Sequence, residues 1–507
     1  MVYTLGIDIG TSGTKTILMN QIGEVIASYT VEYPLYQPQN GYAEQNPSDW
    51  YHAVVDTVAA VVKNSGISKD EIKGIGLSGQ MHGLVMLDEN GEVIRPSIIW
   101  CDGRTAEQCV EITNLVGAEK LLSITANPAI AGFTAAKIMW VKKYEPQNYA
   151  KCKKILLPKD YIRYMLTGEF ATEVSDASGM QLLDIKNRCW SDEVLEKLDI
   201  DKALLATVYE SPEVTGKVTK AFAQATGINE GIIVVGGAGD NAAAAVGTGV
   251  VEDSKAFTTI GTSGVLYAHT STMKLDQKGR VHTFCSAVPN EWHVMGVTQA
   301  AGLSLKWLRD TLCQEEIDYA EQEQVDPYVI MDQLAKKVPI GADKLIYLPY
   351  LMGERTPHLD TNARGVFFGL SAVHTKANFI RAVLEGVSYS LRDCKEVLAE
   401  MGIDANDMMI CGGGAKSPLW RQMLADIYGV DVVVPASSEG AALGVAILAM
   451  VGIGQYKTVQ QACSAIIKKD KVTNANKQSH DQYEPFYRLY RSLYPSLKQS
   501  YQQLNNI

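Results

Sequence analysis

The pattern of apolar and polar residues predicts that the chain begins with a meander of three strands. Apolar residues dominate residues 3–9 and 14–19, and a third strand-like run covers 24–32. Asn46 and Pro47 then begin a helix that we expect to end near Asn64. Later short apolar runs predict further strands over 72–78, 83–87, 155–157 and 232–235. A helix is expected from Asp160 to about Gly168, and an alanine-rich segment over 241–246 follows the last of these strands.

The second half of the chain repeats this order of elements. Its expected strands cover 256–262, 265–268, 281–287, 293–298, 408–411 and 430–434, and its expected helices cover about 300–312 and 375–400 and begin near Ser417 and Glu439. Strands that come first and then alternate with helices, twice over, are typical of α/β domains. A final stripe, Tyr483, Tyr487, Tyr490 and Tyr494, has helical spacing and indicates packing in the core or against another subunit.

One tetrapeptide occurs at the same place in both halves. Gly10-Thr11-Ser12-Gly13 recurs as Gly261-Thr262-Ser263-Gly264, each time between two predicted strands. Glycines permit the backbone angles of a tight turn, and the hydroxyl and N–H groups of such a turn can hold a phosphate. The repeat therefore predicts two related domains that close on one polyphosphate from both sides.

Length and charge limit the remaining possibilities. The 507 residues are too many for a single core, and we expect a division into residues 1–248 and 249–507, with Gly247-Thr248-Gly249 as the hinge. The net charge of −11 disfavours a nucleic-acid or anionic-membrane surface as the main activity. The longest apolar stretch, near 444–453, is too short to span a membrane. Nine cysteines without a zinc-type spacing predict reduced thiols and a cytoplasmic location.

Asp8 lies near the end of the first strand, two residues before the first of these turns. A carboxylate there is costly to bury unless a cation or several donors surround it. It is therefore a candidate ligand for Mg²⁺ or a metal-bound water, and a simple turn cap is the alternative. Lys15 follows the same turn and can reach a phosphate, although a solvated strand lysine would look the same.

Gly236-Gly237-Ala238-Gly239-Asp240-Asn241 follows a buried strand and begins a helix. As a dinucleotide-binding fingerprint it fails, because Asp240 would repel a pyrophosphate and no acidic residue follows about 20 residues on. Asp240 is either a plain N-cap or a general base that the positive end of the helix keeps ionised. As a base it would take the proton of a substrate hydroxyl that Asn241 orients.

Two further loops are candidates for binding. Within Ser78-Gly79-Gln80-Met81-His82-Gly83, His82 could hydrogen-bond a sugar hydroxyl and Met81 could pack on its carbon face, unless His82 is only structural. Gly412-Gly413-Gly414-Ala415-Lys416-Ser417 follows a strand and precedes a helix, so it is either a nucleotide contact or an ordinary turn. The P-loop pattern G-x-x-x-x-G-K-[ST] does not occur.

Together these motifs resemble the FGGY family of carbohydrate kinases, from Gly6 to about Met450. The resemblance implies two actin/hexokinase-like (ribonuclease H-like) domains facing an interdomain cleft, and ATP and Mg²⁺ as cofactors. It implies Asp240 and Asp8 as catalytic residues, with Asp8 at the metal. Implied sugar ligands are Gln80, Met81, His82, Trp100, Asp102 and Asn241. Implied ATP ligands are Thr11, Ser12, Lys15, Gly261, Thr262, Ser263, Gly413, Gly414 and Ser417.

Within that family, Leu77–Gly83 and Trp100–Thr105 resemble the members that phosphorylate D-xylulose to D-xylulose 5-phosphate. Glycerol kinases carry Arg-Glu at the positions of Met81 and His82, and gluconate kinases lack the preceding Gly-Gln. The resemblance implies a sugar and ATP as partners, and a homodimer is common among relatives. Alternatives are a kinase for another ketose or a sugar acid, an actin-like ATP-binding protein without catalysis, and a sugar sensor.

Overall fold

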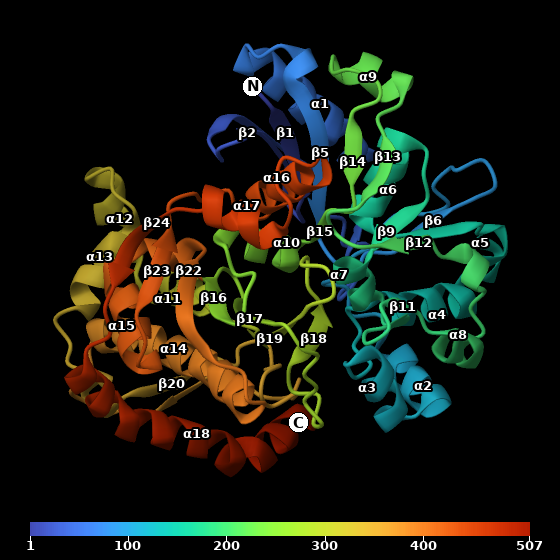
Figure 1. The fold of residues 1–507 in the computed structure, drawn as a ribbon. Coiled ribbons are helices and arrows are strands. Elements are labelled where there is room, and N and C mark those ends of the chain that lie inside the picture. The colour runs from blue at the N-terminus through green and yellow to red at the C-terminus, as the bar shows by residue number, and fades with distance from the viewer.

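The computed structural model describes all 507 residues as two seven-stranded sheets joined by helices (Figure 1). The strands of the first sheet follow the spatial order β13-β14-β5-β1-β2-β3, and β15 pairs with β5 beyond the end of β14. These strands are β1 (Tyr3–Ile9), β2 (Gly13–Asn20), β3 (Val25–Glu32), β5 (Ile72–Gly79), β13 (Val214–Lys217), β14 (Ile233–Val235) and β15 (Ala238–Gly239).

The second sheet repeats the pairing pattern of the first. In each sheet the strand before the repeated turn pairs antiparallel with the strand after it, β1 with β2 and β16 with β17. The same strand pairs parallel with a strand that follows a long crossover, β1 with β5 and β16 with β22. The spatial order is β18-β19-β17-β16-β22-β23-β24. These strands are β16 (Ser254–Ile260), β17 (Gly264–Thr270), β18 (His282–Cys285), β19 (Trp292–Thr298), β22 (Ala405–Cys411), β23 (Val432–Pro435) and β24 (Lys469–Thr473). The predicted duplication of an α/β fold is confirmed.

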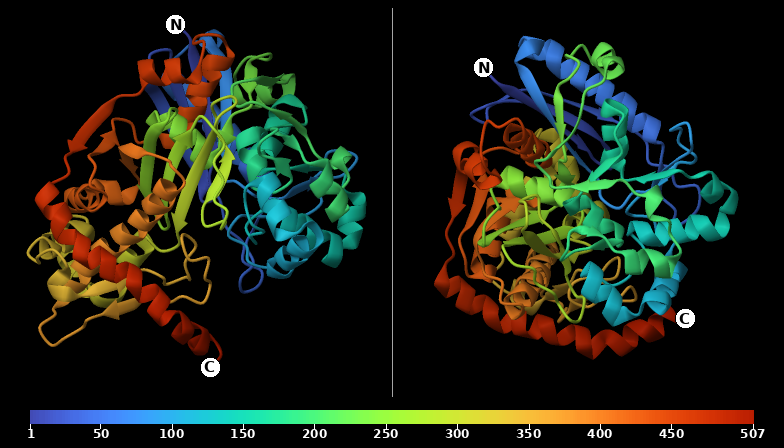
Figure 2. Two further views of the ribbon diagram at one scale, coloured as in Figure 1. Left: turned by 60° about the horizontal axis from the view of Figure 1, so that its bottom comes forward. Right: turned by 45° about the vertical axis from the view of Figure 1, so that its right-hand side comes forward.

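Two helices connect the halves of the molecule. Helix α10 (Asp240–Thr248) packs along α16 (Gly440–Gly452), and α16 lies on strands β1 and β5 of the first sheet although it comes late in the chain (Figures 1 and 2). The approach is close, because a Cβ atom at Gly6 would lie 2.0 Å from the carbonyl oxygen of Ala442. Glycine is therefore needed in β1 for the helix to pack on the strand.

The hinge prediction for Gly247-Thr248-Gly249 needs correction. Gly247 and Thr248 form the last turn of α10, and only Gly249, with φ of 77°, lies beyond it as the left-handed cap. A Cβ at Gly247 would lie 2.0 Å from the carbonyl oxygen of Gly440, so this glycine permits close packing of α10 on α16. The segment is part of a helix contact between the halves, not a free linker.

A mostly helical region between β5 and β13 lies beside the first sheet (Figure 1), and most of it surrounds a hydrophobic core of its own. Its helices are α2 (Ala106–Val116), α3 (Ala118–Thr125), α4 (Thr134–Tyr144), α5 (Pro146–Lys151), α6 (Pro158–Thr167), α7 (Val174–Ala177) and α8 (Asp192–Leu198). Its short strands are β6 (Val85–Leu87), β7 (Ser97–Ile98), β8 (Lys154–Leu156), β9 (Ala171–Glu173), β10 (Leu183–Asp184), β11 (Cys189–Trp190) and β12 (Thr207–Tyr209). The sequence analysis assigned only two strands and one helix here.

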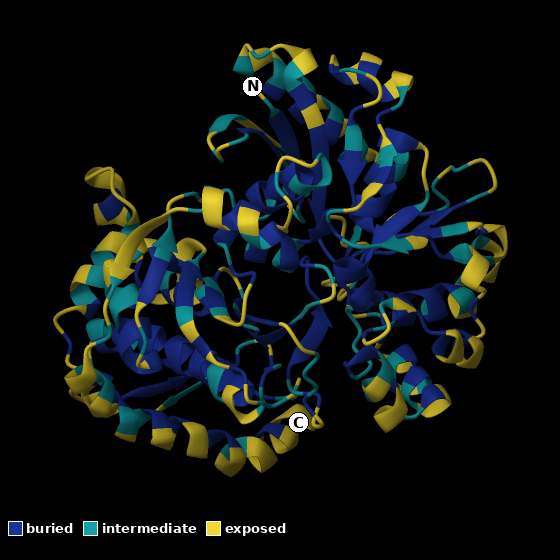
Figure 3. Cartoon of the chain, viewed as in Figure 1, coloured by how far each residue is buried: buried dark blue, intermediate teal, exposed yellow.

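The remaining helices cover the two sheets, whose central strands are buried, while the edge strands β3 and β24 are partly exposed (Figure 3). They are α1 (Pro47–Ser65) and α9 (Lys220–Thr226) in the first half, and α11 (Gly302–Leu312), α12 (Gln314–Gln322), α13 (Pro327–Ala335), α14 (Lys376–Glu400), α15 (Pro418–Tyr428), α17 (Val459–Ile466) and α18 (Lys477–Asn505) in the second. The short strands β4 (Glu44–Gln45), β20 (Ile346–Leu348) and β21 (Val366–Phe368) complete the chain. Most predicted elements occur within a few residues of their expected bounds.

The tyrosine stripe of α18 packs in the core of its own chain. Tyr483, Tyr487 and Tyr490 surround Tyr389 of α14, with ring centroids 5.4–6.3 Å apart. The Tyr487 hydroxyl donates to Asp393 at 2.8 Å. Core packing, one of the two interpretations of this stripe, is confirmed. No helix in the structure is both long and apolar enough to cross a bilayer.

Candidate active site

The two candidate catalytic carboxylates lie on either side of β5, Asp8 in β1 and Asp240 directly after β15. Asp8 of β1 and Ala238 of β15 both pair with Ser78, and Gly239 pairs with Gly79. Asp240 follows as the first residue of α10, with Gly239 as the N-cap, so the alternative that Asp240 is itself the N-cap is wrong. Neighbouring strands are about 4.8 Å apart, so this register holds the two acids near each other where β1 and β15 end.

Burial and, as the second cause, the negative charge of Asp8 raise the pKa of Asp240 to about 7. The backbone N–H and the side-chain amide of Asn241 donate to Asp240 Oδ1 at 2.7 and 2.9 Å and oppose this shift. We expected the helix end to keep Asp240 ionised, and with a pKa of about 7 the carboxyl group is ionised only in part at neutral pH. Desolvation outweighs the helix N-terminus, and the carboxyl group exchanges its proton near neutral pH.

Burial also raises the pKa of Asp8, while Ser78 and the positive charge of Lys15 lower it. Asp8 Oδ1 is buried without a hydrogen-bond partner. An orphaned carboxylate oxygen is costly in the interior, and a hydrated cation would satisfy it. No three His, Cys, Asp or Glu residues cluster as a metal site, and Asp8 with water ligands would fit the oxygen coordination of Mg²⁺.

The loop after β5 places Met81 and His82 next to the segment that precedes Asp240. Met81 packs against Gly239, where a Cβ atom would lie 2.9 Å from Met81 Cγ. His82 has a φ of 70°, and its Nδ1 lies 2.9 Å from the carbonyl oxygen of Gly179. Burial lowers the pKa of His82 to about 3, so the ring is neutral. A carbonyl oxygen can only accept a hydrogen bond, so the proton of the neutral ring lies on Nδ1. His82 Nε2 is therefore able to accept a hydrogen bond from a ligand hydroxyl.

Residues of α4 fix the strained backbone of His82. Lys137 Nζ donates to the carbonyl oxygen of His82 at 2.7 Å and to that of Gly132 at 2.8 Å, and Thr134 Oγ1 donates to His82 at 3.1 Å. Burial lowers the pKa of Lys137 to about 7. The sequence analysis missed both residues, because neither forms part of a motif and 52 or more positions separate them from His82.

The side chain of Gln80 hydrogen-bonds to the backbone of the first turn and to Gln45, which also bonds to that turn. The Gln80 side-chain amide donates to Gln45 Oε1 at 2.8 Å and to the carbonyl oxygen of Gly10 at 3.4 Å, and Gln45 donates to the carbonyl oxygen of Thr11 at 2.7 Å. Gln80 is 1% exposed. These contacts favour a role in holding the turn, and the predicted contact of Gln80 with a sugar stays a prediction.

Trp100 and Asp102 occupy different environments. Trp100 is exposed, and its indole N–H donates to Thr11 Oγ1 at 2.9 Å. Both oxygens of Asp102 are already engaged by the guanidinium of Arg104 at 2.7–3.0 Å, and Oδ2 also accepts from Ala43 N at 2.6 Å. Asp102 is therefore tied into an internal ion pair, and its role as a sugar ligand stays a prediction.

Each repeated turn is closed by the N–H of its first glycine, which reaches three residues on in the first turn and two residues on in the second. Gly10 N donates to the Gly13 carbonyl oxygen and Gly261 N to that of Ser263, both at 3.0 Å. The first turn is also held by Tyr33, whose hydroxyl donates to the Gly10 carbonyl oxygen at 2.5 Å. In the second, the N–H groups of Ala301 and Gly302 at the start of α11 donate to the carbonyl oxygens of Thr262 and Gly261 at 3.0 and 2.8 Å. Ser12 stays exposed.

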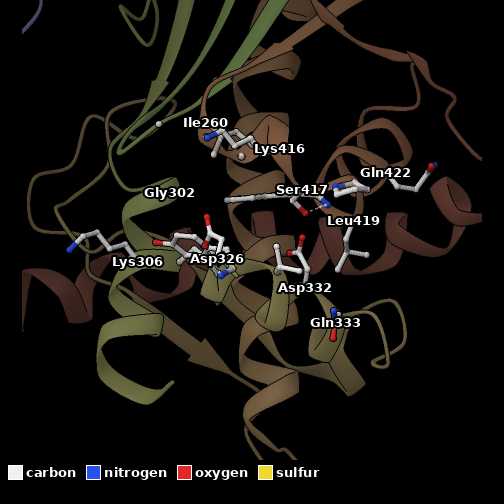
Figure 4. A pocket seen from close by; sticks show the side chains of 18 of the residues that line it. Ile260, Gly302, Lys306, Asp326, Asp332, Gln333, Lys416, Ser417, Leu419 and Gln422 are labelled. Carbon is white, nitrogen blue, oxygen red and sulfur yellow. Dashed lines mark hydrogen bonds between the residues drawn. The ribbon is translucent and has the colours of Figure 1, made fainter. Parts of the chain in front are cut away.

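A cavity of about 770 Å³ lies beside the second turn (Figure 4). Five of the predicted ATP ligands line it, namely Gly261, Thr262, Gly413, Gly414 and Ser417. Helix α13 supplies Tyr328, Val329 and Asp332 to the same wall, which the sequence analysis missed because α13 carries no recognisable motif. Asp332 lies opposite Ser417 in this wall. Burial raises the pKa of Asp332, and a hydrogen bond with Ser417 partly opposes that rise.

The structure does not place the other predicted ATP ligands at this cavity. Thr11, Ser12, Lys15 and Ser263 are not among its lining residues. Lys15 Nζ instead forms an ion pair with Glu439 Oε2 at 2.5 Å, just before α16. Their roles in holding phosphates stay predictions.

Sequence comparison assigns this architecture to a known class of enzymes. The N-terminal and C-terminal domain profiles of the FGGY family of carbohydrate kinases match residues 3–247 and 256–453. The chain belongs to this family and is a sugar kinase. The predicted boundary at residue 248 falls between the two matches and stays a prediction.

Several relatives are similar over nearly the whole chain. Xylulose kinase of Bacillus subtilis is 38% identical over 98% of both sequences. Gluconokinase of the same organism is 33% identical over 89% of this chain and 88% of its own. The crystal structure of ligand-bound xylulose kinase from Lactobacillus acidophilus has a TM-score of 0.92 at 27% identity, covering 99% of this chain and all of that one.

Proposed function

We propose that this sugar kinase is a xylulokinase, which transfers the γ-phosphate of ATP to the terminal hydroxyl of D-xylulose and releases ADP and D-xylulose 5-phosphate. The observation that carries the proposal is the position of the Gln80–His82 loop directly after β5, the strand between Asp8 and Asp240. Relatives named xylulose kinase over their full length support the same substrate.

Asp240 is the proposed general base. Its carboxylate would accept the proton of the sugar hydroxyl as that oxygen attacks the γ-phosphorus in line. A pKa of about 7 suits this role, because the group is a sufficiently strong base and is still ionised in a large fraction of molecules at neutral pH. Asn241 would orient the same hydroxyl while its amide donates to Asp240.

His82 and Met81 are the proposed sugar contacts. The neutral ring of His82 would accept a hydroxyl through Nε2, and Met81 would pack on the carbon face of the sugar. Lys137 and Thr134 hold His82 in place, so the acceptor is oriented before the sugar arrives.

The adenosine of ATP would bind in the cavity beside Gly413 and Gly414, with its phosphates at the second turn. The phosphates would extend toward Thr11, Ser12 and Lys15. Closure of the two halves would exclude water, which competes with the sugar as acceptor. Asp8 would hold Mg²⁺ through water ligands. When bound, this ion neutralises charge on the transferring phosphoryl group.

A sugar acid is the second candidate substrate, favoured by the similarity to a gluconokinase over 89% of this chain. ADP release measured with D-xylulose, other pentuloses and hexuloses, gluconate and glycerol separates the candidates. The proposal expects the highest kcat/KM with D-xylulose, and a higher value with gluconate would overturn it. ATP binding without ADP release for any sugar would indicate a non-catalytic protein. The cytoplasmic location and a homodimer stay predictions.

A further inference from the structure

A cluster of charged side chains lies fully buried behind the segment that leads into Asp240. Lys159 Nζ contacts Asp160 Oδ1 at 2.7 Å and both Glu173 Oε1 and Asp176 Oδ2 at 3.3 Å. Arg163 also contacts Asp160, at 3.2 Å, and none of these side chains is exposed. Burying ions costs several kcal/mol for each group, so such a cluster is weak support for stability. Its contacts indicate a positioning role.

The cluster holds the backbone just before Asp240. Arg163 donates to the carbonyl oxygen of Val235 at 3.2 Å and to that of Gly236 at 2.6 Å. Farther along the same segment, the N–H of Gly239 donates to Ser175 Oγ at 3.1 Å. The Ser175 hydroxyl in turn donates to Glu173 Oε1 at 3.0 Å.

We propose that Ser175, oriented by Glu173, is a positioning residue for the base Asp240. This inference rests on the proposed function, in which Asp240 takes the proton of the sugar. Gly239 is both the N-cap of α10 and the residue bonded to Asp240, so the Ser175 hydroxyl fixes the start of the helix that carries the carboxylate. Displacing a reacting group by about 1 Å can cost about 100-fold in rate, which gives one hydrogen bond at this point a large effect.

The same carboxylate provides a matched control. Ser211 Oγ donates to the other oxygen of Glu173, Oε2, at 3.0 Å and is as buried as Ser175. Ser175→Ala and Ser211→Ala each remove one buried hydroxyl from Glu173, but only the first removes the acceptor of the Gly239 N–H. Both variants should lose thermal stability, and only Ser175→Ala should also lose turnover.

The experiment is a double-mutant cycle of Ser175→Ala with Asp240→Asn in the full chain, using D-xylulose and ATP. Rates are normalised to the number of ADP-binding sites per chain from calorimetry, so misfolded protein does not count as slow enzyme. We expect Ser175→Ala to lower kcat about 10- to 100-fold, with little change in KM for ATP. In the Asp240→Asn background the same substitution should have little effect, because the group it positions is gone.

An equal loss of kcat in both backgrounds would overturn the inference, because Ser175 would then not act through Asp240. An equal loss in Ser211→Ala would overturn it as well. Failure of the proposed function looks different: the Asp240→Asn single variant would keep the normal rate, or D-xylulose would not be a substrate of the unchanged enzyme. If Ser175→Ala does not fold, Ser175→Cys keeps a side-chain acceptor that is weaker and slightly larger, and the same cycle applies to it.

Discussion

Asp8 pairs with Ser78 from one side of β5, Asp240 follows the strand that pairs with Ser78 from the other side, and the charge of Asp8 contributes to a pKa of about 7 at Asp240. The separation of the two carboxylates by one strand gives the site two acids with different tasks. Asp8 has an unpartnered oxygen suited to a hydrated cation, whereas Asp240 is the proton acceptor in the proposed function. Their coupling makes the pH profile a direct test of the site.

The pH dependence of kcat/KM should show an acid limb near pH 7. Asp240 must lose its proton to act as a base, so activity should fall as pH falls through its raised pKa. Asp8→Asn removes a neighbouring negative charge and should move the limb to lower pH while also lowering the maximum rate. Initial rates from pH 5.5 to 9 at saturating ATP measure both effects. A limb that stays fixed in Asp8→Asn would contradict the coupling.

Asp240→Asn should lower kcat by about 10²–10⁴ while ATP binding persists. The same variant should not lose stability at pH 8. The folded state raises this pKa above the unfolded value of 3.8, so the ionised group destabilises the fold as pH rises above that value, and removing it relieves the cost. Turnover, ATP titration by calorimetry and melting at pH 8 test the prediction. Near-full activity would remove Asp240 from its role.

His82→Ala should raise KM for the sugar and leave KM for ATP nearly unchanged. The effect should not vary between pH 6 and 8, because the pKa of His82 is about 3 and the ring is neutral throughout. Steady-state kinetics with each substrate varied in turn measure the split. Lys137→Met should act in the same direction, since Lys137 donates to the His82 carbonyl oxygen. An unchanged sugar profile in His82→Ala would make His82 a structural residue.

The ion pair of Lys15 with Glu439 separates two roles for Lys15. If Lys15 binds a phosphate, Lys15→Met should raise KM for ATP several-fold, and Glu439→Gln should raise it less or not at all. If Lys15 serves only the ion pair, KM for ATP and the melting temperature should change equally in the two variants, because each variant breaks the same contact. KM for ATP and melting temperature of both variants decide between the roles. This pair is partly exposed, so we expect a small loss of stability.

The strands, the repeated turns and the position of Asp8 could be predicted, because each depends on residues close together in the chain. The contacts that hold the site could not. Gln80 reaches Gln45 across 35 positions, and Lys137 reaches His82 across 55, with no local pattern in either case. The raised pKa of Asp240 could not be predicted for a related reason. The local helix end favours the charge, but burial and Asp8, which become neighbours only in the fold, oppose it.

A last prediction tests the cavity beside the second turn. A Cβ atom at Gly413 would meet only the carbonyl oxygen of Ile260, at 3.9 Å, so a larger side chain fits there without displacing the backbone. Gly413→Leu should fill part of the cavity and weaken ADP binding about 10-fold or more, with the melting temperature of the free protein nearly unchanged. Calorimetric titration with ADP measures the loss, and sugar KM at saturating ATP is the internal control. Unchanged ADP affinity in this variant would place the nucleotide elsewhere, because a base or ribose in this cavity cannot share its volume with the leucine.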